Sequence, residues 1–160
     1  MSWSRRRFLQ VGVAGTVVLA TAGYLARPRG DVITALVPVV LAGSLPQDPA
    51  GRARAIAETA AAFHRAVAGL TPAVQAEVAQ LLALLRFMPT RLAFTGIVSP
   101  LDEAAPAEVA AFLQRWRASR FDLLRASYQA LTQLTQAAWY DNPSSWQAIG
   151  YPGPPRNVGA

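Results

Sequence analysis

The spacing of apolar residues constrains the fold of this chain most strongly, because it has the period of an α-helix almost throughout. Apolar side chains recur at intervals of three and four residues, as in the segment from Ile56 to Leu70, and this spacing places them on one face of a helix. No stretch alternates between apolar and polar residues for long enough to indicate a β-strand. The sequence therefore predicts an all-α fold, a single helical bundle of about four to six helices.

Helix start and stop residues divide this pattern into segments. Asp31 is placed to cap a short first helix that contains Pro38. Gly69 marks the end of a second helix, and Thr71 followed by Pro72 marks the start of a third. Further along the chain, the apolar side chains expected to be buried are Val74, Val78, Leu81, Leu82 and Leu85, up to Met88 and Pro89; Val109, Phe112, Leu113 and Trp116; and Phe121, Leu124, Tyr128, Leu131, Leu134 and Ala138. Residues 91–94 predict one further helical piece before a turn.

The beginning of the chain has the form of a twin-arginine export signal. The residues that carry the motif are Ser4, Arg5, Arg6, Phe8 and Leu9, and an apolar run follows them. A basic start, a weakly apolar segment and small residues for a peptidase are the three parts such a signal needs. The rival interpretation is an ordinary signal anchor with a chance arginine triplet. The serine before the pair and the Phe-Leu after it favour the export signal.

Small side chains at Ala20 and Ala22 occupy the two positions that a signal peptidase recognises. They predict a signal peptide over residues 1–22, cleaved before Gly23. An uncleaved anchor reaching residue 26 is the alternative, since the acid-free segment is nearly long enough to cross a bilayer, but its glycines and alanines favour cleavage. We expect a periplasmic protein that uses the twin-arginine translocase and meets the inner membrane only through this segment.

Composition excludes several classes of protein. The chain has no Cys, so neither disulfides nor thiolate metal sites can stabilise it, although an oxidising compartment is permitted. Its net charge of +6 resembles that of a nucleic-acid binder, but Arg5, Arg6 and Arg7 supply half of this excess. The mature domain is only mildly basic, and we expect no nucleic-acid partner.

Residues suited to catalysis or metal binding are few. His64 is the only histidine, and no second His or Cys can join it in a transition-metal site. The acids Asp102, Glu103 and Glu108 stand at a helix start, where they complement the helix dipole. The arginines Arg115, Arg117, Arg120 and Arg125 form a basic patch that is best explained as a solvated helix face. We therefore predict no catalytic, cofactor-binding or metal-ligating residue in this chain.

The end of the chain is rich in aromatic residues, although its Gly and Pro oppose regular structure. We expect a helical domain over residues 23–142 and an irregular C-terminal tail over residues 143–160. Large apolar side chains are seldom left uncovered, so something should cover Trp146 and Tyr151. Two alternatives stay open: the tail folds back on its own helices, or a second protein covers it.

The leader, the helical domain and the tail together resemble a known family. The tail reads Trp139-Tyr140-Asp141-Asn142-Pro143, followed by Trp146-Gln147-Ala148-Ile149-Gly150-Tyr151-Pro152-Gly153-Pro154. This end is similar to that of the small subunits that accompany periplasmic flavin dehydrogenases of the glucose-methanol-choline group, such as the small subunit of gluconate 2-dehydrogenases.

The resemblance implies a non-catalytic subunit that binds a FAD-bearing large subunit, helps it mature and carries it through the export channel. A multihaem cytochrome c often takes the electrons in such complexes. The residues expected to bind the partner are Trp139, Tyr140, Trp146, Ile149, Gly150, Tyr151, Pro152 and Gly153.

Two other classes of function stay open. One is a stand-alone periplasmic helical protein that binds a small apolar ligand or a lipid within its bundle. The other is a cofactor-independent enzyme, for which the sequence offers no recognisable set of acids or nucleophile.

Overall fold

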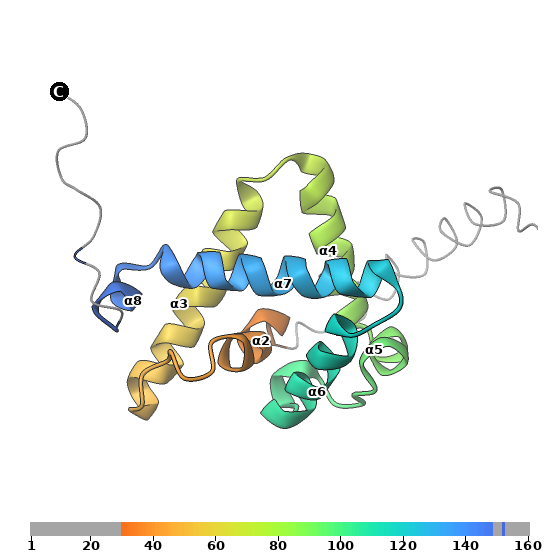
Figure 1. Cartoon of the computed structure of the whole chain (residues 1–160), viewed down its shortest axis with the longest axis horizontal. Coiled ribbons are helices and arrows are strands. Elements are labelled where there is room, and N and C mark those ends of the chain that lie inside the picture. Colours follow the sequence, from red (N-terminus) through yellow and green to blue (C-terminus); the bar gives the residue numbers. More distant parts are fainter. Residues whose placement is uncertain (1–29, 149–151, 153–160) are drawn as a thin grey trace, which may run out of the picture.

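The computed structural model describes residues 30–148 and residue 152, and all regular structure in this part of the chain is helical (Figure 1). The elements, in chain order, are α2 (Val32–Val40), α3 (Pro49–Ala68), α4 (Pro72–Arg86), α5 (Met88–Thr95), the 3-10 helix η1 (Leu101–Glu103), α6 (Pro106–Arg117), α7 (Asp122–Tyr140) and α8 (Pro143–Ala148). The prediction of an all-α helical bundle is confirmed. The export signal predicted over residues 1–22 lies outside the described residues.

Helix α2 lies at the centre of the bundle. It contacts α3, α4, α6, α7 and η1, and Ile33, Leu36 and Val37 are completely buried. A helix that is apolar on nearly every side is stable in water only when other elements cover it. Helices α3, α4, α6 and α7, together with η1, therefore form a shell around α2.

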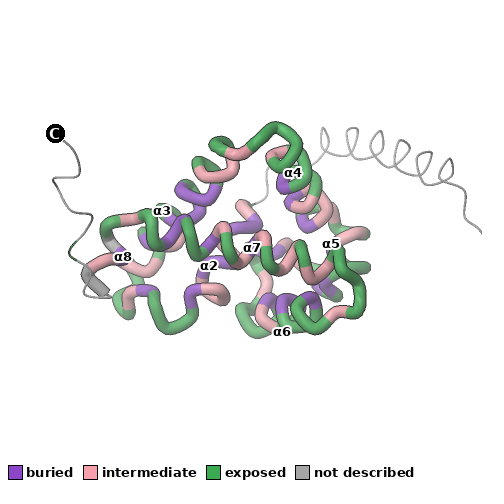
Figure 2. The backbone as a smooth tube through the Cα atoms, turned by 45° about the horizontal axis from the view of Figure 1, so that its top comes forward, coloured by how far each residue is buried: buried purple, intermediate pink, exposed green. Residues whose placement is uncertain are grey.

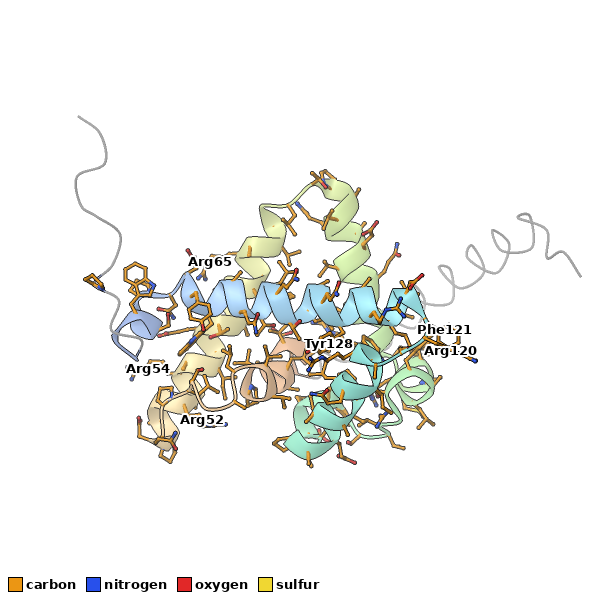
Figure 3. The ribbon with its side chains drawn as sticks, viewed as in Figure 1. Arg52, Arg54, Arg65, Arg120, Phe121 and Tyr128 are labelled. Atoms are coloured by element: carbon orange, nitrogen blue, oxygen red, sulfur yellow. The ribbon has the colours of Figure 1, made fainter. Side chains whose placement is uncertain are left out.

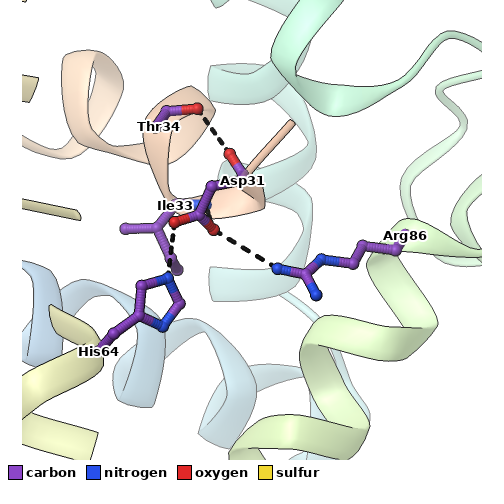
Figure 4. Close-up of polar contacts among 5 residues, drawn as sticks. All are labelled: Asp31, Ile33, Thr34, His64 and Arg86. Atoms are coloured by element: carbon purple, nitrogen blue, oxygen red, sulfur yellow. Dashed lines mark hydrogen bonds and ion pairs between the residues drawn. The ribbon is translucent and has the colours of Figure 1, made fainter. Parts of the chain in front are cut away.

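Polar contacts of Asp31 fix the start of α2 (Figure 4). The Asp31 carboxylate accepts a hydrogen bond from the Ile33 backbone N–H at 3.1 Å, which is the predicted N-cap. Its other oxygen lies 2.6 Å from Nε2 of His64 on α3, and Nη2 of Arg86 at the end of α4 lies 3.7 Å from the carboxylate. One side chain thus connects the start of α2 with α3 and with the end of α4.

Helices α3 and α7 cross (Figure 1), and most of the side chains that they bury are small. The buried residues are Ala55, Thr59, Ala60, Ala62 and Phe63 on α3, and Leu131, Thr135, Ala138 and Trp139 on α7. The hydroxyls of Thr59 and Thr135 donate to the backbone carbonyls four residues earlier, each at 2.7 Å. Because these hydroxyls are satisfied within their own helices, they can be buried at little cost.

Helix α4 ends two residues before the predicted limit. It stops at Arg86, Phe87 is extended, and α5 begins at Met88. Pro89 explains the break, because its ring would clash with the carbonyl four residues earlier and it has no N–H to donate. The short helix α5 then ends at Gly96, whose positive φ of 73° suits glycine.

Two side chains expected in the core lie at the surface. Val74 is 39% exposed at the start of α4, next to the exposed turn between α3 and α4 (Figure 2). Phe121 is 56% exposed, because it is the N-cap of α7 and precedes the helix whose face it was expected to share. The expected burial was wrong for both residues.

Helix α8 occupies the first part of the segment for which irregular structure is expected. Pro143 opens this helix, and proline is well tolerated at a first helical position because its missing N–H would have no partner there. The glycine and proline residues that oppose helix formation come later, from Gly150 onward.

The charge of the described domain is balanced. All nine acids of the chain lie within it, whereas six of the fifteen basic residues lie outside it: Arg5, Arg6, Arg7, Arg27, Arg29 and Arg156. The excess of +6 therefore belongs to the two ends of the chain. Among the described helices, none combines the length and hydrophobicity of a membrane span.

Two leucines on α7 test where the core lies. Leu131 is 1% exposed and Leu123 is 73% exposed. We expect Leu131→Ala to lower the free energy of unfolding by about 2–5 kcal/mol, since it leaves a cavity, and Leu123→Ala to change it by less than about 0.5 kcal/mol. Urea denaturation of the mature chain measures both. Equal effects would contradict this arrangement of α7.

The two aspartate caps give a second comparison. Asp48 caps α3 by accepting from the Gly51 N–H at 2.6 Å, but only Asp31 also contacts His64 and Arg86. We expect Asp48→Ala to cost about 1 kcal/mol of unfolding free energy and Asp31→Ala about 2 kcal/mol, because the second removes a cap and two side-chain contacts. Thermal denaturation of both variants tests the order, and an Asp48→Ala variant that is the less stable of the two would contradict it.

Candidate partner-binding surfaces

The end of α7 divides two neighbouring aromatic residues between the core and the surface. Trp139 is 3% exposed, whereas Tyr140 is 51% exposed. Successive residues of a helix point about 100° apart, so one of the pair packs inward while the next faces outward. Of these two predicted partner-binding residues, only Tyr140 presents much of its side chain to solvent.

Hydrogen bonds around Asn142 hold α8 against the end of α7. The Asn142 side-chain amide donates to Glu58 Oε2 on α3 at 2.9 Å. The Asn142 backbone carbonyl accepts from the Ser145 N–H at 3.0 Å and from the Ser145 hydroxyl at 2.8 Å. The indole Nε1 of Trp146 donates to the Tyr140 carbonyl at 2.8 Å. We call the surface formed by Tyr140 and Trp146 the aromatic corner.

Trp146 is half-buried in this corner. Part of its indole is therefore covered by this chain. Pro152 is exposed. The other residues predicted to bind the partner, Ile149, Gly150, Tyr151 and Gly153, lie outside the described residues, as do Ser4, Arg5, Arg6, Phe8, Leu9, Ala20 and Ala22 of the export signal.

A second exposed surface lies at the opposite end of α7, beside α5 (Figure 1). It is marked by large apolar side chains that are at least 43% exposed, and we call it the apolar end: Met88, Leu92, Phe94, Val98, Phe121 and Leu123. Trp116 on α6 is linked to the α5 part of this surface, because its Nε1 donates to the Phe94 carbonyl at 2.9 Å. Exposed apolar side chains of this size commonly mark an interaction surface where they lie together.

Two arginines of the expected basic patch donate hydrogen bonds to backbone carbonyls, although Arg115 is exposed and Arg125 is half-buried. Arg115 donates to the Thr95 carbonyl. Arg125 donates to the Ser119 carbonyl at 2.7 Å and pairs with Asp122. These two guanidiniums hold α5, α6 and α7 together.

Arg117 and Arg120 remain exposed at the edge of the apolar end. The Arg120 guanidinium lies 4.8 Å from the centre of the Phe121 ring (Figure 3), a cation–π contact. In the described part of the chain, neither arginine has an ion-pair partner.

The remaining chemical candidates have structural roles in the described residues. Glu108 accepts from the Ala105 N–H at 3.1 Å at the start of α6, and His64 is part of the contacts of Asp31. Within residues 30–148, no group of three or more His, Asp or Glu side chains could hold a metal ion.

Sequence reasoning missed the apolar end. The exposure of Leu123 could have been predicted from the sequence. Leu123 stands one residue before the apolar stripe that begins at Leu124, so it cannot lie on the buried face of that helix. The exposure of Phe94 and Val98 gave no such signal, since the pattern between Pro89 and Pro106 has no clear period.

Comparisons with known proteins identify no relative of this chain: no family model, no curated protein and no solved structure matches it. A functional interpretation therefore depends on the leader, the tail sequence and the two exposed surfaces.

The adjacent aromatic residues at the end of α7 allow core and interface to be separated. We expect Trp139→Ala to lower the free energy of unfolding by about 3–5 kcal/mol, because it empties a core position. Tyr140→Ala should change stability by less than about 0.5 kcal/mol and weaken association with a partner at this corner by about 2 kcal/mol or more. Denaturation and a binding titration measure the two effects, and a Tyr140→Ala variant with unchanged association would remove Tyr140 from the interface.

Proposed function

We propose that this chain is the non-catalytic small subunit of a periplasmic dehydrogenase. It binds a FAD-dependent large subunit of the glucose-methanol-choline type, assists its maturation and carries it through the twin-arginine translocase. FAD and catalysis belong to the large subunit, and a multihaem cytochrome c subunit is a candidate electron acceptor.

The observation that carries this proposal is the pairing of an export motif with an aromatic C-terminus. Arg5 and Arg6 stand in the sequence context that the twin-arginine route uses. That route transports folded proteins and serves chiefly enzymes that receive their cofactor in the cytoplasm. A small chain with this leader and without a recognisable cofactor motif fits a carrier for such an enzyme.

The aromatic corner supports binding to a protein. Tyr140 is exposed and Trp146 is half-buried, and the corner directly precedes the tail segment that resembles the small-subunit family. Trp and Tyr concentrate binding energy at protein interfaces. Because Trp146 is held by its hydrogen bond to the Tyr140 carbonyl, docking would cost it little conformational entropy.

Isolation of the chain from its native periplasm tests the proposal directly. A tag after Ala160 would be used to recover the chain, and the eluate would be scanned for flavin absorbance and for a large protein identified by mass. We expect a stoichiometric flavoprotein of the glucose-methanol-choline type. A colourless monomer without a companion would contradict the proposal and would favour a stand-alone bundle that binds a small apolar ligand.

Replacement of both leader arginines tests the carrier role. We expect the double variant Arg5→Lys, Arg6→Lys to leave both this chain and the flavoprotein in the cytoplasm, because the large subunit would cross only while bound. Fractionation followed by assay of the flavoprotein in each compartment measures the effect. A flavoprotein that reaches the periplasm in normal amount in the variant would show that it is exported independently.

A further inference from the structure

The outer face of α7 joins the apolar end to the aromatic corner. Residues at alternating intervals of three and four lie along it: Leu123, Ala126, Ala130, Gln133, Ala137 and Tyr140. This face is opposite the one that buries Leu131, Thr135 and Ala138, and none of its six residues is buried. Intervals that alternate between three and four residues are the spacing with which one helix contacts another.

This outer face lacks the charges that a solvated helix normally carries. From Ala126 to Tyr140, α7 contains no Asp, Glu, Lys or Arg at all. In contrast, the outward residues of α3 include Arg54, Glu58 and Arg65, two of which are labelled in Figure 3. Depletion of charge and the presence of aromatic residues distinguish the centre of protein interfaces from the rest of a surface.

The dimensions of this face fit a protein partner. Leu123 and Tyr140 mark its two ends, and at 1.5 Å per residue they lie about 26 Å apart along the helix. A stable interface covers about 800 Å² on each partner, which corresponds to a patch about 30 Å across. One interface of ordinary size would therefore include both exposed ends of α7 and the uncharged face between them.

From these observations we infer that the large subunit docks along the outer face of α7, with contacts at both the aromatic corner and the apolar end. This inference rests on the proposed function, and it assigns the face of the bundle that binds the large subunit. Arg117 and Arg120 stand exposed and without ion-pair partners among the described residues at one end of the face. The complementary surface of the large subunit is therefore uncharged at its centre and acidic where it meets these arginines.

The centre of the face argues against a lipid surface as the occupant. Membrane-surface helices insert large apolar side chains along their length and carry Lys or Arg beside them. The middle of this face carries Ala126, Ala130, Gln133 and Ala137, which offer little apolar area for insertion. Small side chains instead allow another protein backbone to approach closely.

A charge placed at the middle of this face tests the inference. In the full chain, tagged after Ala160 and expressed in its native host, Gln133→Arg would be compared with Gln80→Arg, the same change at an exposed position of α4. We expect Gln133→Arg to reduce the flavoprotein recovered per small subunit by about tenfold or more, because it buries an unpaired charge in the interface. Gln80→Arg should change recovery by less than about twofold, since rim and remote surface charges have small effects.

A second pair repeats the test at another position. Ala126→Arg on the outer face is matched by Ala76→Arg, because Ala76 is also an exposed alanine and lies on α4. Melting temperatures of all four variants show that the bundle remains folded, and recovery is compared only among variants that melt like the wild type.

The outcomes separate this inference from the proposed function. If the wild type recovers the flavoprotein and both outer-face variants recover it equally well, the inference is overturned and the proposed function stands. If the wild type recovers no flavoprotein, the proposed function fails. If the purified wild type is a dimer that Gln133→Arg dissociates while flavoprotein recovery is unchanged, the face belongs to a second copy of this chain and the inference is overturned.

Discussion

Burial of α2 is the interaction on which the rest of this structure depends. A helix of nine residues is too short to be stable alone in water, so its helical form depends on the Asp31 cap and on the helices packed around it. Those helices, in turn, cover their apolar faces with Ile33, Leu36 and Val37. Because neither part is stable without the other, the bundle should fold as one cooperative unit. The contacts of Asp31 with His64 and Arg86 set the position of α2 within the shell.

Local chemistry made the helix limits predictable, whereas burial depended on packing that the sequence does not specify. Asp31, Gly69 and Pro72 mark helix ends as expected, because capping and the properties of proline and glycine act within a few residues. Periodicity identified the buried face of α7, but it could not show that Phe121 lies before the helix and outside the core. The early end of α4 was also readable in principle, since Pro89 forbids its continuation.

The candidate surfaces were less predictable than the fold. Trp139 and Tyr140 are adjacent and both aromatic, and only the three-dimensional direction of each side chain separates a core residue from a surface one. Four arginines in sequence suggested one basic patch, yet Arg115 and Arg125 donate to backbone carbonyls. Arg117 and Arg120 are exposed and have no ion-pair partner among the described residues. The four arginines differ in this way because a guanidinium donates hydrogen bonds to whichever carbonyls the fold brings near it. Tyr151 and its neighbours in the tail lie outside the described residues.

The balanced charge of the described domain has a kinetic consequence. With its nine acids matched by nine arginines, the domain has no net monopole to attract a distant protein, and any local potential is screened within about 10 Å at ordinary salt. For the described domain alone, encounter would then proceed without long-range steering, at about 10⁵–10⁶ M⁻¹ s⁻¹ and with little dependence on ionic strength. The lifetime of a complex, set by close contact, would therefore determine how much of it persists.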